Sequence, residues 1–564
     1  MSKPSRRPTR EARKTHQAKV KTARRRLASQ QKATGLVAPQ CQSVSNRLSP
    51  YHSVAEEQAA REEAVAAQIG VYRHLLPGLL QKLAKIPDPR QPKKIKHRLT
   101  VVLIYGLLMC VFQMASRREA NAEMSQPVFL STLQQLFPEL ETLPHADTLN
   151  RVLARLDLEQ LEEAHIALVK RLIRHKKFHR YLIENRYPIA IDGTQKLARH
   201  GPWWNAEWLQ RQHQGADGDW IQQYVYVLEA NLVFHNGLTV PLLSEFLSYG
   251  EGDPDDHKQD CERKAFKRLA RRLKAYFKRL PILLLLDGLY PTGPVMEQCR
   301  RYHWDYMIVL PQQCLPSVWE EVEGLSPWQA ANHWAHLWRG RQQHFRWVND
   351  IEYRYDHDAH VLPVHVVICE ESWQEVDPDS AKIVDHNSRQ VWISSRRLRW
   401  DCLHERCNLG ARSRWGIETS LLVEKRQGYH YEHAFSYDWN AMKGFHDLMR
   451  LAHLLNAIAQ YTQRVAKQIR TQGVRAFLKC VRETCAHPWL SPQWIQHLLA
   501  TPSNSGSNRH SPHAPGYPPP RWVADLPTGY CASPSASIPN QPSPQAVMTG
   551  LTAPWHTQKV IGLG

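Results

Sequence analysis

Two short apolar runs that each end in Asp-Gly constrain the fold of this chain more than any other feature. Residues 188–191 (Pro-Ile-Ala-Ile) precede Asp192, and residues 281–286 (Pro-Ile-Leu-Leu-Leu-Leu) precede Asp287. A short continuous apolar run is typical of a strand that is buried on both faces of a sheet. Because the carboxyl ends of neighbouring strands lie side by side in mixed sheets, we expect the two aspartates to approach each other. For either aspartate alone, a turn at the end of a strand is the simpler explanation.

The segments around these two runs alternate between strand and helix signals. The turn His235-Asn-Gly237 predicts a hairpin between two strands. Charged residues at helical spacing predict an amphipathic helix before the second apolar run, and another helix and strand follow that run. The hairpin strands are expected at 224–233 and 238–247, the helices at 258–278 and 295–302, and the last strand at 306–310. Residues 181–310 are therefore predicted to form an α/β fold with a mixed sheet.

Residues 66–180 carry apolar residues at three- and four-residue spacing, which predicts a helical domain. Helices are expected at 71–86, 99–114, 130–137 and 149–156, and the stretch His145-Ala-Asp-Thr148 can supply an N-cap before the last of them. Short helices joined by basic turns at Arg117 and Arg118 fit a helix-turn-helix that binds a DNA end. A plain helical bundle fits equally well, because one sequence does not identify a recognition helix.

The two ends of the chain differ in composition from its middle. Residues 1–65 are rich in Arg, Lys, Ala and Gln, which predicts a basic arm that is disordered or folds on binding. Residues 501–564 are rich in Pro, Ser, Asn and Gly, which predicts a disordered tail. The chain has 73 Lys and Arg against 53 Asp and Glu, a net charge of +20. This excess favours a polyanionic partner such as nucleic acid, although a basic protein kept soluble by its charge explains it equally well.

The second half of the chain is first β-rich and then helical. Residues 311–400 are Trp-rich, with strands expected at 345–355, 361–368 and 390–394, and helical periodicity runs through residues 401–500 from about Arg412. At about 100° per residue, Glu418 lies about 40° around a helix from Arg414, and Lys425 lies only about 20° from Arg414. One helix face therefore presents a carboxylate flanked by two cations. A solvated, salt-bridging face explains these charges too.

Three motifs, in this order, resemble the DDE transposases of bacterial insertion sequences. They are Ile-Asp192-Gly-Thr, Leu-Leu-Asp287-Gly and Arg414-x3-Glu418-x6-Lys425. The third motif is similar to the Tyr-x2-Arg-x3-Glu-x6-Lys signature of one branch of that family, but Ala411 stands where the signature has Tyr. The resemblance covers residues 80–480 and includes further sequence segments, namely Asp88-Pro-Arg, Pro144-His-Ala-Asp-Thr-Leu-Asn-Arg151, Lys258-Gln-Asp-Cys-Glu262 and Arg414-Trp-Gly-Ile-Glu418.

The resemblance implies an RNase H-like catalytic core in two parts, residues 181–310 and 401–500, with residues 311–400 as a β-rich insertion. It implies a catalytic triad of Asp192, Asp287 and Glu418 that holds two Mg²⁺ ions, for which Mn²⁺ can substitute; their ligands are hard oxygens. Asp192 would bind both ions, Asp287 one and Glu418 the other. Arg414 and Lys425 would bind DNA phosphates. In the family the signature Tyr contacts a phosphate near the transferred end, so Ala411 puts that contact in doubt.

The implied reaction is hydrolysis that frees a 3′-hydroxyl at the element end, followed by attack of that hydroxyl on target DNA. The partners would be double-stranded DNA, as terminal inverted repeats and target, and a second copy of the chain in the active complex. Related enzymes also stack an extruded base on aromatic residues of the insertion. Trp334, Trp338 and Trp347 lie near arginines in the sequence and are candidates for that role, although packing in a small core is the simpler explanation for any single Trp.

Other functions remain open at this stage. An RNase H-like nuclease that cuts without joining would share the triad, and a catalytically inactive, domesticated DNA-binding protein would share the basic surface. A basic RNA-associated scaffold would explain the charge but not the triad. We expect no membrane span, because the longest apolar segment, 99–112, is too short. Eleven irregularly spaced cysteines and the absence of a secretory signal predict a cytoplasmic protein, and the resemblance implies a bacterial, nucleoid-associated one.

Overall fold

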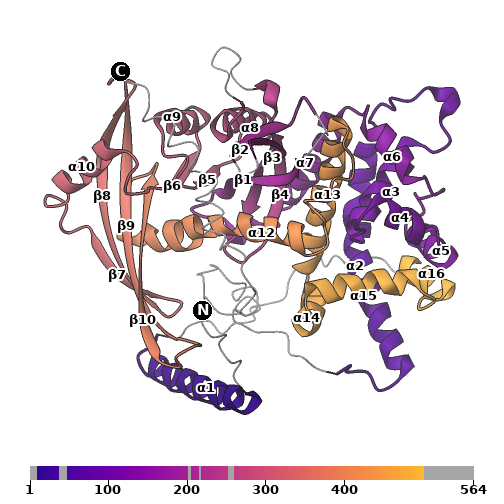
Figure 1. Ribbon diagram of the computed structural model, residues 1–564, viewed down its shortest axis with the longest axis horizontal. Helices are drawn as coiled ribbons and strands as arrows, with labels where there is room; N and C mark the ends of the chain where they lie inside the picture. Colours follow the sequence, from indigo (N-terminus) through magenta and orange to yellow (C-terminus); the bar gives the residue numbers. More distant parts are fainter. Residues whose placement is uncertain (1–8, 37–47, 201–204, 215–217, 252–258, 501–564) are drawn as a thin grey trace. The chain divides into compact units, whose positions relative to one another are not determined.

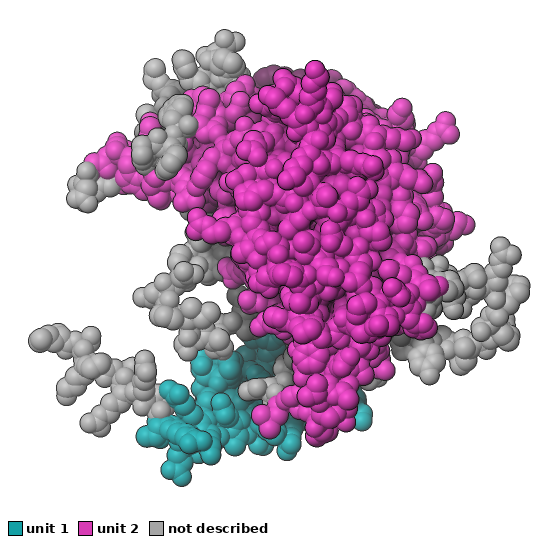
Figure 2. All heavy atoms as spheres, turned by 90° about the vertical axis from the view of Figure 1, so that its right-hand side faces the viewer, with its two compact units in different colours: residues 1–37, 372–387, 529–564 teal, residues 38–371, 388–528 magenta. Residues whose placement is uncertain are grey.

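The computed structural model describes residues 9–36, 48–200, 205–214, 218–251 and 259–500. The chain divides into two compact units, shown in different colours in Figure 2. Of the described residues, 9–36 and 372–387 belong to the smaller unit and the remainder to the larger one. The candidate site residues all lie in the larger unit.

The described strands form one ten-stranded mixed sheet in the order β2-β3-β1-β5-β6-β10-β9-β8-β7, with β4 also paired to β3. Strand β1 is antiparallel to β3 and parallel to β5, and β5 is parallel to β6. The strands are β1 Tyr187–His200, β2 Leu209–His213, β3 Trp220–Val233, β4 Thr239–Phe246, β5 Ile282–Leu286, β6 Asp305–Val309, β7 His333–Trp338, β8 Arg341–Tyr355, β9 His360–Val376 and β10 Ile383–Ser394. The mixed α/β fold predicted for residues 181–310 is confirmed.

The elements predicted around the two aspartates are present. The hairpin of β3 and β4 turns at the expected residues, where the Phe234 amide donates to the Leu238 carbonyl at 2.9 Å. Every residue of β5 is buried, as its apolar run predicts. The prediction that the first strand ends at Asp192 is wrong, because β1 continues to His200 through its antiparallel pairing with β3.

The helices of the larger unit share one hydrophobic core with the sheet. Helix α13 packs against α3, α6 and α7 and also against β4, so the helices before and after the sheet form one body (Figure 1). The α-helices of the larger unit are α2 Val54–Leu83, α3 Leu99–Val111, α4 Arg117–Met124, α5 Pro127–Leu136, α6 Ala146–Leu153, α7 Leu158–Arg174, α8 Glu262–Tyr276, α9 Gly293–Tyr302, α10 Pro316–Leu325, α11 Trp400–Leu403, α12 Trp415–Arg426, α13 Trp439–Gln460, α14 Gln463–Gln472, α15 Val474–Ala486 and α16 Pro492–Ala500. The helical nature of residues 66–180 is confirmed, and His145 is the N-cap of α6, as expected.

The β-rich region continues the core sheet. Strand β10 pairs antiparallel with β6, so that Trp392 lies opposite Val309. The region also contains α10, a helix that the β-like sequence pattern did not predict. After β10 the chain becomes helical at Trp400, earlier than predicted, and passes through a π-helical segment, His404–Gly410, and a 3₁₀ segment, Ala411–Arg414, before α12.

The basic arm predicted over residues 1–65 is helical in most of its described part, so the disordered alternative is wrong there. Helix α1, Arg10–Ala33, is capped by Thr9, and α2 begins at Val54. Within the smaller unit, the His16 ring lies 2.7 Å from the carbonyl of Pro378. The predicted tail at 501–564 and the start of the helix predicted from residue 258 lie outside the described residues. None of the described helices is long and apolar enough to cross a membrane.

Candidate active site

Asp192 and Asp287 occupy equivalent positions on two neighbouring parallel strands. The pairing of β1 with β5 ends at Ala190 opposite Leu285, and each aspartate lies two residues further along the chain. Paired strands lie about 4.8 Å apart, so this register brings the two aspartates side by side. The sequence-based expectation that they approach each other is met, although Asp192 lies within a strand and only Asp287 follows the end of one.

Glu418 joins these aspartates from α12, which packs against β1, β3 and β4. Its carboxylate forms an ion pair with Arg414, with 3.0 Å between Oε1 and Nη2. The Arg414 side chain is buried and its guanidinium lies 4.7 Å from the ring centroid of Trp415. The structure therefore brings together Asp192, Asp287, Glu418 and Arg414.

The pKa values show that these groups interact electrostatically. Burial raises the pKa of Asp192 well above its usual value; Arg414 opposes this shift, and the carboxylates of Glu418, Asp287 and Glu262 increase it. The pKa of Glu418 is also raised, mainly by burial, with Arg414 opposing and Asp287 adding to the shift. Raised pKa values from burial and repulsion between acids are frequent at functional sites.

Glu262 is a fourth acid of this group, and sequence reasoning assigned it no role. It is the first residue of α8, and its carboxylate accepts hydrogen bonds from the Tyr226 hydroxyl at 2.6 Å and the Tyr290 hydroxyl at 3.3 Å. A Cβ on Gly193, the neighbour of Asp192, would lie 2.6 Å from Glu262 Oε1. The only signal in the sequence was that Glu262 closes one of the stretches that resemble transposases.

Each of these carboxylates also has a partner of its own. Asp192 accepts a hydrogen bond from the Gly193 amide at 3.1 Å, and Asp287 accepts one from the Leu289 amide at 2.9 Å. In the part of the chain that the structure describes, no three His, Cys, Asp or Glu side chains are gathered closely enough to hold a metal ion as they stand. By donor chemistry, however, several half-buried carboxylates that raise one another's pKa suit a hard divalent cation.

Lys425 and Ala411 differ in environment from Arg414. The Lys425 ammonium donates to the carbonyl of Gln195 at 3.1 Å and pairs with Glu432 at 3.1 Å, so it holds α12 to β1. Ala411, at the position of the signature Tyr, is buried in the hydrophobic core. A tyrosine at this position would have to displace core side chains.

The insertion contains an open pocket lined by aromatic and cationic residues. Its volume is about 400 Å³, and the lining residues are Ala331, Asn332, His333, Trp334, Trp347, Asn349, Arg397, Leu398, Arg399 and Trp400. Of the three predicted tryptophans, Trp334 and Trp347 line this pocket. Trp338 does not line it and packs instead between the guanidinium groups of Arg339 and Arg412. The exposed Trp400, which had not been predicted as a site residue, lies at the rim.

The fold and the acid group define a class of protein, an α/β protein with a half-buried acidic site beside two neighbouring parallel strands of a mixed sheet. Comparison with known families narrows this class. Residues 80–169, from the end of α2 to α7, match the family model of the DDE_Tnp_1-associated domain, which belongs to DDE transposase families. The match includes two of the stretches that resemble transposases, Asp88-Pro-Arg and Pro144–Arg151. No curated protein matches the chain.

Proposed function

We propose that this protein is an insertion-sequence transposase that cleaves DNA at element ends and joins those ends to target DNA. The observation that carries the proposal is that Asp192, Asp287 and Glu418 lie close enough to interact electrostatically, in a chain that matches the model of the DDE_Tnp_1-associated domain. The three residues come from widely separated parts of the sequence, so a chance run of acidic residues does not explain their proximity.

The strand arrangement supports an RNase H-like core within this proposal. The order β4-β3-β1-β5-β6 combines three antiparallel strands with two that run parallel to β1. The resemblance implies such a core; Asp192 lies within β1 and Asp287 follows the end of the neighbouring strand β5. In this interpretation residues 311–400 are the insertion, although their strands extend the same sheet rather than form a separate one.

The three triad carboxylates would hold two divalent cations, with Mg²⁺ preferred because the ligands are hard oxygens. When bound, such ions supply an activated water and relieve charge on the leaving oxygen. Arg414 would bind a DNA phosphate near the scissile bond, with its guanidinium already oriented by Glu418 and Trp415. Lys425 contributes less directly in this proposal, because Gln195 and Glu432 engage its ammonium.

The proposed partners are element-end and target DNA, with a homodimer in the active complex, since two ends are joined. The net charge of +20 favours such a partner, and the basic residues of α1 add to it. The aromatic pocket of the insertion is suited to an extruded base, because Trp faces stack bases and neighbouring Arg residues hold the backbone.

Cleavage of the terminal inverted repeats that flank the gene tests the function. Wild-type protein with Mg²⁺ or Mn²⁺ should leave a 3′-hydroxyl at the element end. Asp287→Ala should abolish cleavage while binding to the same DNA persists. Asp358→Asn is the matched control, because Asp358 is an exposed acid in the turn between β8 and β9, with a φ of 64° that Asn tolerates.

The outcomes separate the proposal from its alternatives. Binding of the repeats without cleavage by the wild type, with either metal, would favour the inactive DNA-binding protein. Cleavage without joining to a target plasmid would favour a nuclease.

The base-stacking role has its own test. A 2-aminopurine base near the cleaved end should be quenched on binding to the wild type but not to Trp334→Ala. Trp328→Ala is the control, since Trp328 is 87% exposed and does not line the pocket. Equal quenching by both variants would show that the pocket takes no base.

A further inference from the structure

A buried ionic cluster joins the helix of Glu418 to the strands that carry the acidic site. Its centre is Arg450 on α13, which is only 2% exposed. One nitrogen of its guanidinium donates to Glu424 on α12 at 2.9 Å. The other donates to Asn231 at 2.5 Å and pairs with Glu229 on β3 at 3.1 Å. One side chain therefore connects α12, α13 and the sheet.

Glu229 ties this cluster to Asp192. The two residues lie directly opposite each other in the antiparallel pair of β1 and β3, so their side chains are on the same face of the sheet. The Glu229 carboxylate also accepts hydrogen bonds from the Tyr431 hydroxyl at 2.9 Å and the Ser244 hydroxyl at 2.6 Å, and it lies 3.0 Å from the His446 ring. Glu229 is thus fixed beside Asp192 on several sides.

Glu424 ties the same cluster to Glu418. It lies six residues further along α12 and is fully buried, with His453 2.5 Å from its carboxylate. A helix is rigid over less than two turns, so fixing Glu424 also fixes the height and rotation of Glu418 above the sheet. The Arg450 guanidinium therefore spans from the cross-strand neighbour of Asp192 to the helix that carries Glu418.

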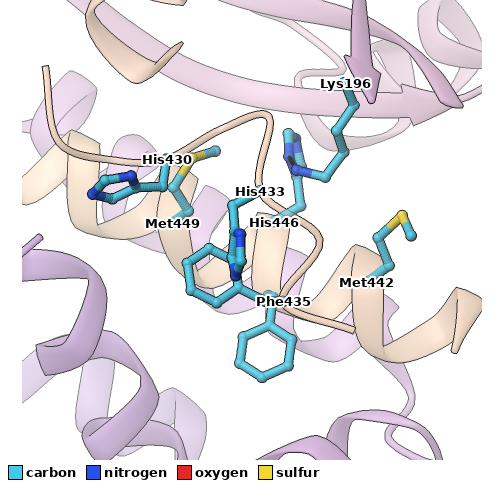
Figure 3. A pocket seen from close by; sticks show the side chains of 8 residues that line it. Lys196, His430, His433, Phe435, Met442, His446 and Met449 are labelled. Carbon is cyan, nitrogen blue, oxygen red and sulfur yellow. Dashed lines mark hydrogen bonds between the residues drawn. The ribbon is translucent and has the colours of Figure 1, made fainter. Parts of the chain in front are cut away.

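The cavity beside Lys196 and His446 is too small for a ligand. Figure 3 shows Lys196 reaching from its strand toward His446. Its ammonium donates to the Tyr431 carbonyl at 2.8 Å and lies 3.5 Å from His446 Nδ1. The adjacent cavity measures about 10 Å³, which is enough for one water molecule at most.

Stability alone does not account for such a cluster. Removing charges from water is costly, and well-packed apolar residues of the same size often stabilise a protein as much or more. Buried ionic groups can instead select one register of packed elements. Here the planar guanidinium of Arg450 has donors in fixed directions that meet carboxylates on two different elements. An apolar contact would not fix the relative position of those elements in this way.

We propose that Glu229, Arg450 and Glu424 are positioning residues that set the register of α12 on the sheet and so hold Glu418 against Asp192 and Asp287. This inference rests on the proposed function for its catalytic consequence. The ionic cluster touches neither DNA nor the reacting atoms, and it acts only through the placement of Glu418.

The test replaces the Arg450 guanidinium and its two carboxylate partners together, so that none of the three is left without the others. The triple variant Glu229→Gln, Glu424→Gln, Arg450→Met should remain folded and bind terminal-repeat DNA as the wild type does. Its cleavage rate should fall by about 100-fold, since a displacement of about 1 Å in a catalytic group can cost that much. A cleavage rate equal to that of the wild type would overturn the proposal.

A matched control is the Glu-Arg-Glu cluster of Glu162, Arg272 and Glu245, which joins α7, α8 and β4 without contacting α12. The same three replacements there should leave cleavage within a few-fold of the wild type. An equal loss in both triple variants would show a general effect of buried charge and overturn the proposal. Should the triple variant of the Arg450 cluster not fold, Arg450→Lys keeps the charge but loses the fork, and a wild-type cleavage rate for it would equally count against the proposal.

Hydrogen exchange gives a readout that does not depend on activity. Amides of residues 415–426 should exchange faster in the triple variant, whereas those of 262–276 in α8 should not change. Unchanged exchange in 415–426 would overturn the positioning role. Should the wild type bind but not cleave DNA, the proposed function fails, while the exchange measurement still decides whether the ionic cluster holds α12.

Discussion

Gly193→Ala is a sharp test of how closely α8 approaches the acidic site. A Cβ at this position would lie 2.6 Å from Glu262 Oε1 and 2.6 Å from Tyr226 Cε1, whereas ordinary contacts begin at 3.4 Å. Each contact must therefore lengthen by roughly 0.8 Å, and the hydrogen bond between Tyr226 and Glu262 lies directly in the way. Overpacking of this kind typically costs about 1–3 kcal/mol. We expect that loss in the free energy of unfolding, together with a lower cleavage rate.

Urea denaturation of metal-free protein at pH 7 measures this loss. Gly324→Ala is the control, because nothing lies within 4 Å of a Cβ there; as a helical position it should gain up to about 1 kcal/mol. Adding Glu262→Ala to Gly193→Ala removes one of the two clashing side chains and should recover part of the loss. Wild-type stability of Gly193→Ala would refute the inferred close packing of Glu262 against β1.

Three further predictions concern other charged groups. Burial lowers the pKa of His165 to about 4, so below pH about 6.5 the folded chain binds fewer protons than the unfolded chain. Stability is therefore lost as the pH falls from about 6.5 to 4, by about 3 kcal/mol in total. Urea titrations across this range should show a smaller loss for His165→Gln than for the wild type. Arg412→Met should lower the melting temperature, because it removes the 2.6 Å partner of the buried Glu371 carboxylate; calorimetry showing no change would contradict the importance of that pair. Burial and Asp287 raise the pKa of Glu262, so its charge destabilises the fold above pH about 4.5; Glu262→Gln should therefore stabilise metal-free protein at pH 7, and a lower melting temperature would contradict this.

Local sequence patterns predicted the strands that carry the two aspartates but not their full pairing. The apolar run before Asp287 has the length of β5, because both faces of that strand are buried. The run before Asp192 marks only the part of β1 that pairs with β5. Beyond Ile191 the strand is held by β3, and residues 192–195 (Asp-Gly-Thr-Gln) are half-buried, so hydropathy no longer identifies it as a strand.

Contacts between distant residues account for most of what the sequence did not predict. The register that places Asp192 beside Asp287 depends on pairing across the sheet, and the place of Glu262 depends on α8 packing against Gly193. Spacing along α12 predicted the Arg414–Glu418 pair, because both residues lie on one helical run. It did not predict the contacts of Lys425, whose ammonium is bound by a carbonyl of β1 and by Glu432. The spacing of residues along a helix does not predict such contacts with other elements.

The contrast between Asp192 and Glu229 is itself an argument for function. The two acids face each other across one strand pair, yet their pKa values are shifted in opposite directions. Burial would raise the pKa of Glu229, but Arg450 and His446 outweigh it and hold that pKa at about 2. At Asp192 the opposition of Arg414 is insufficient, and three neighbouring acids raise its pKa further. Cationic side chains thus stabilise the charge of Glu229, whereas its neighbour Asp192 lies among other acids. This electrostatic pattern is typical of a site that binds a cationic ligand.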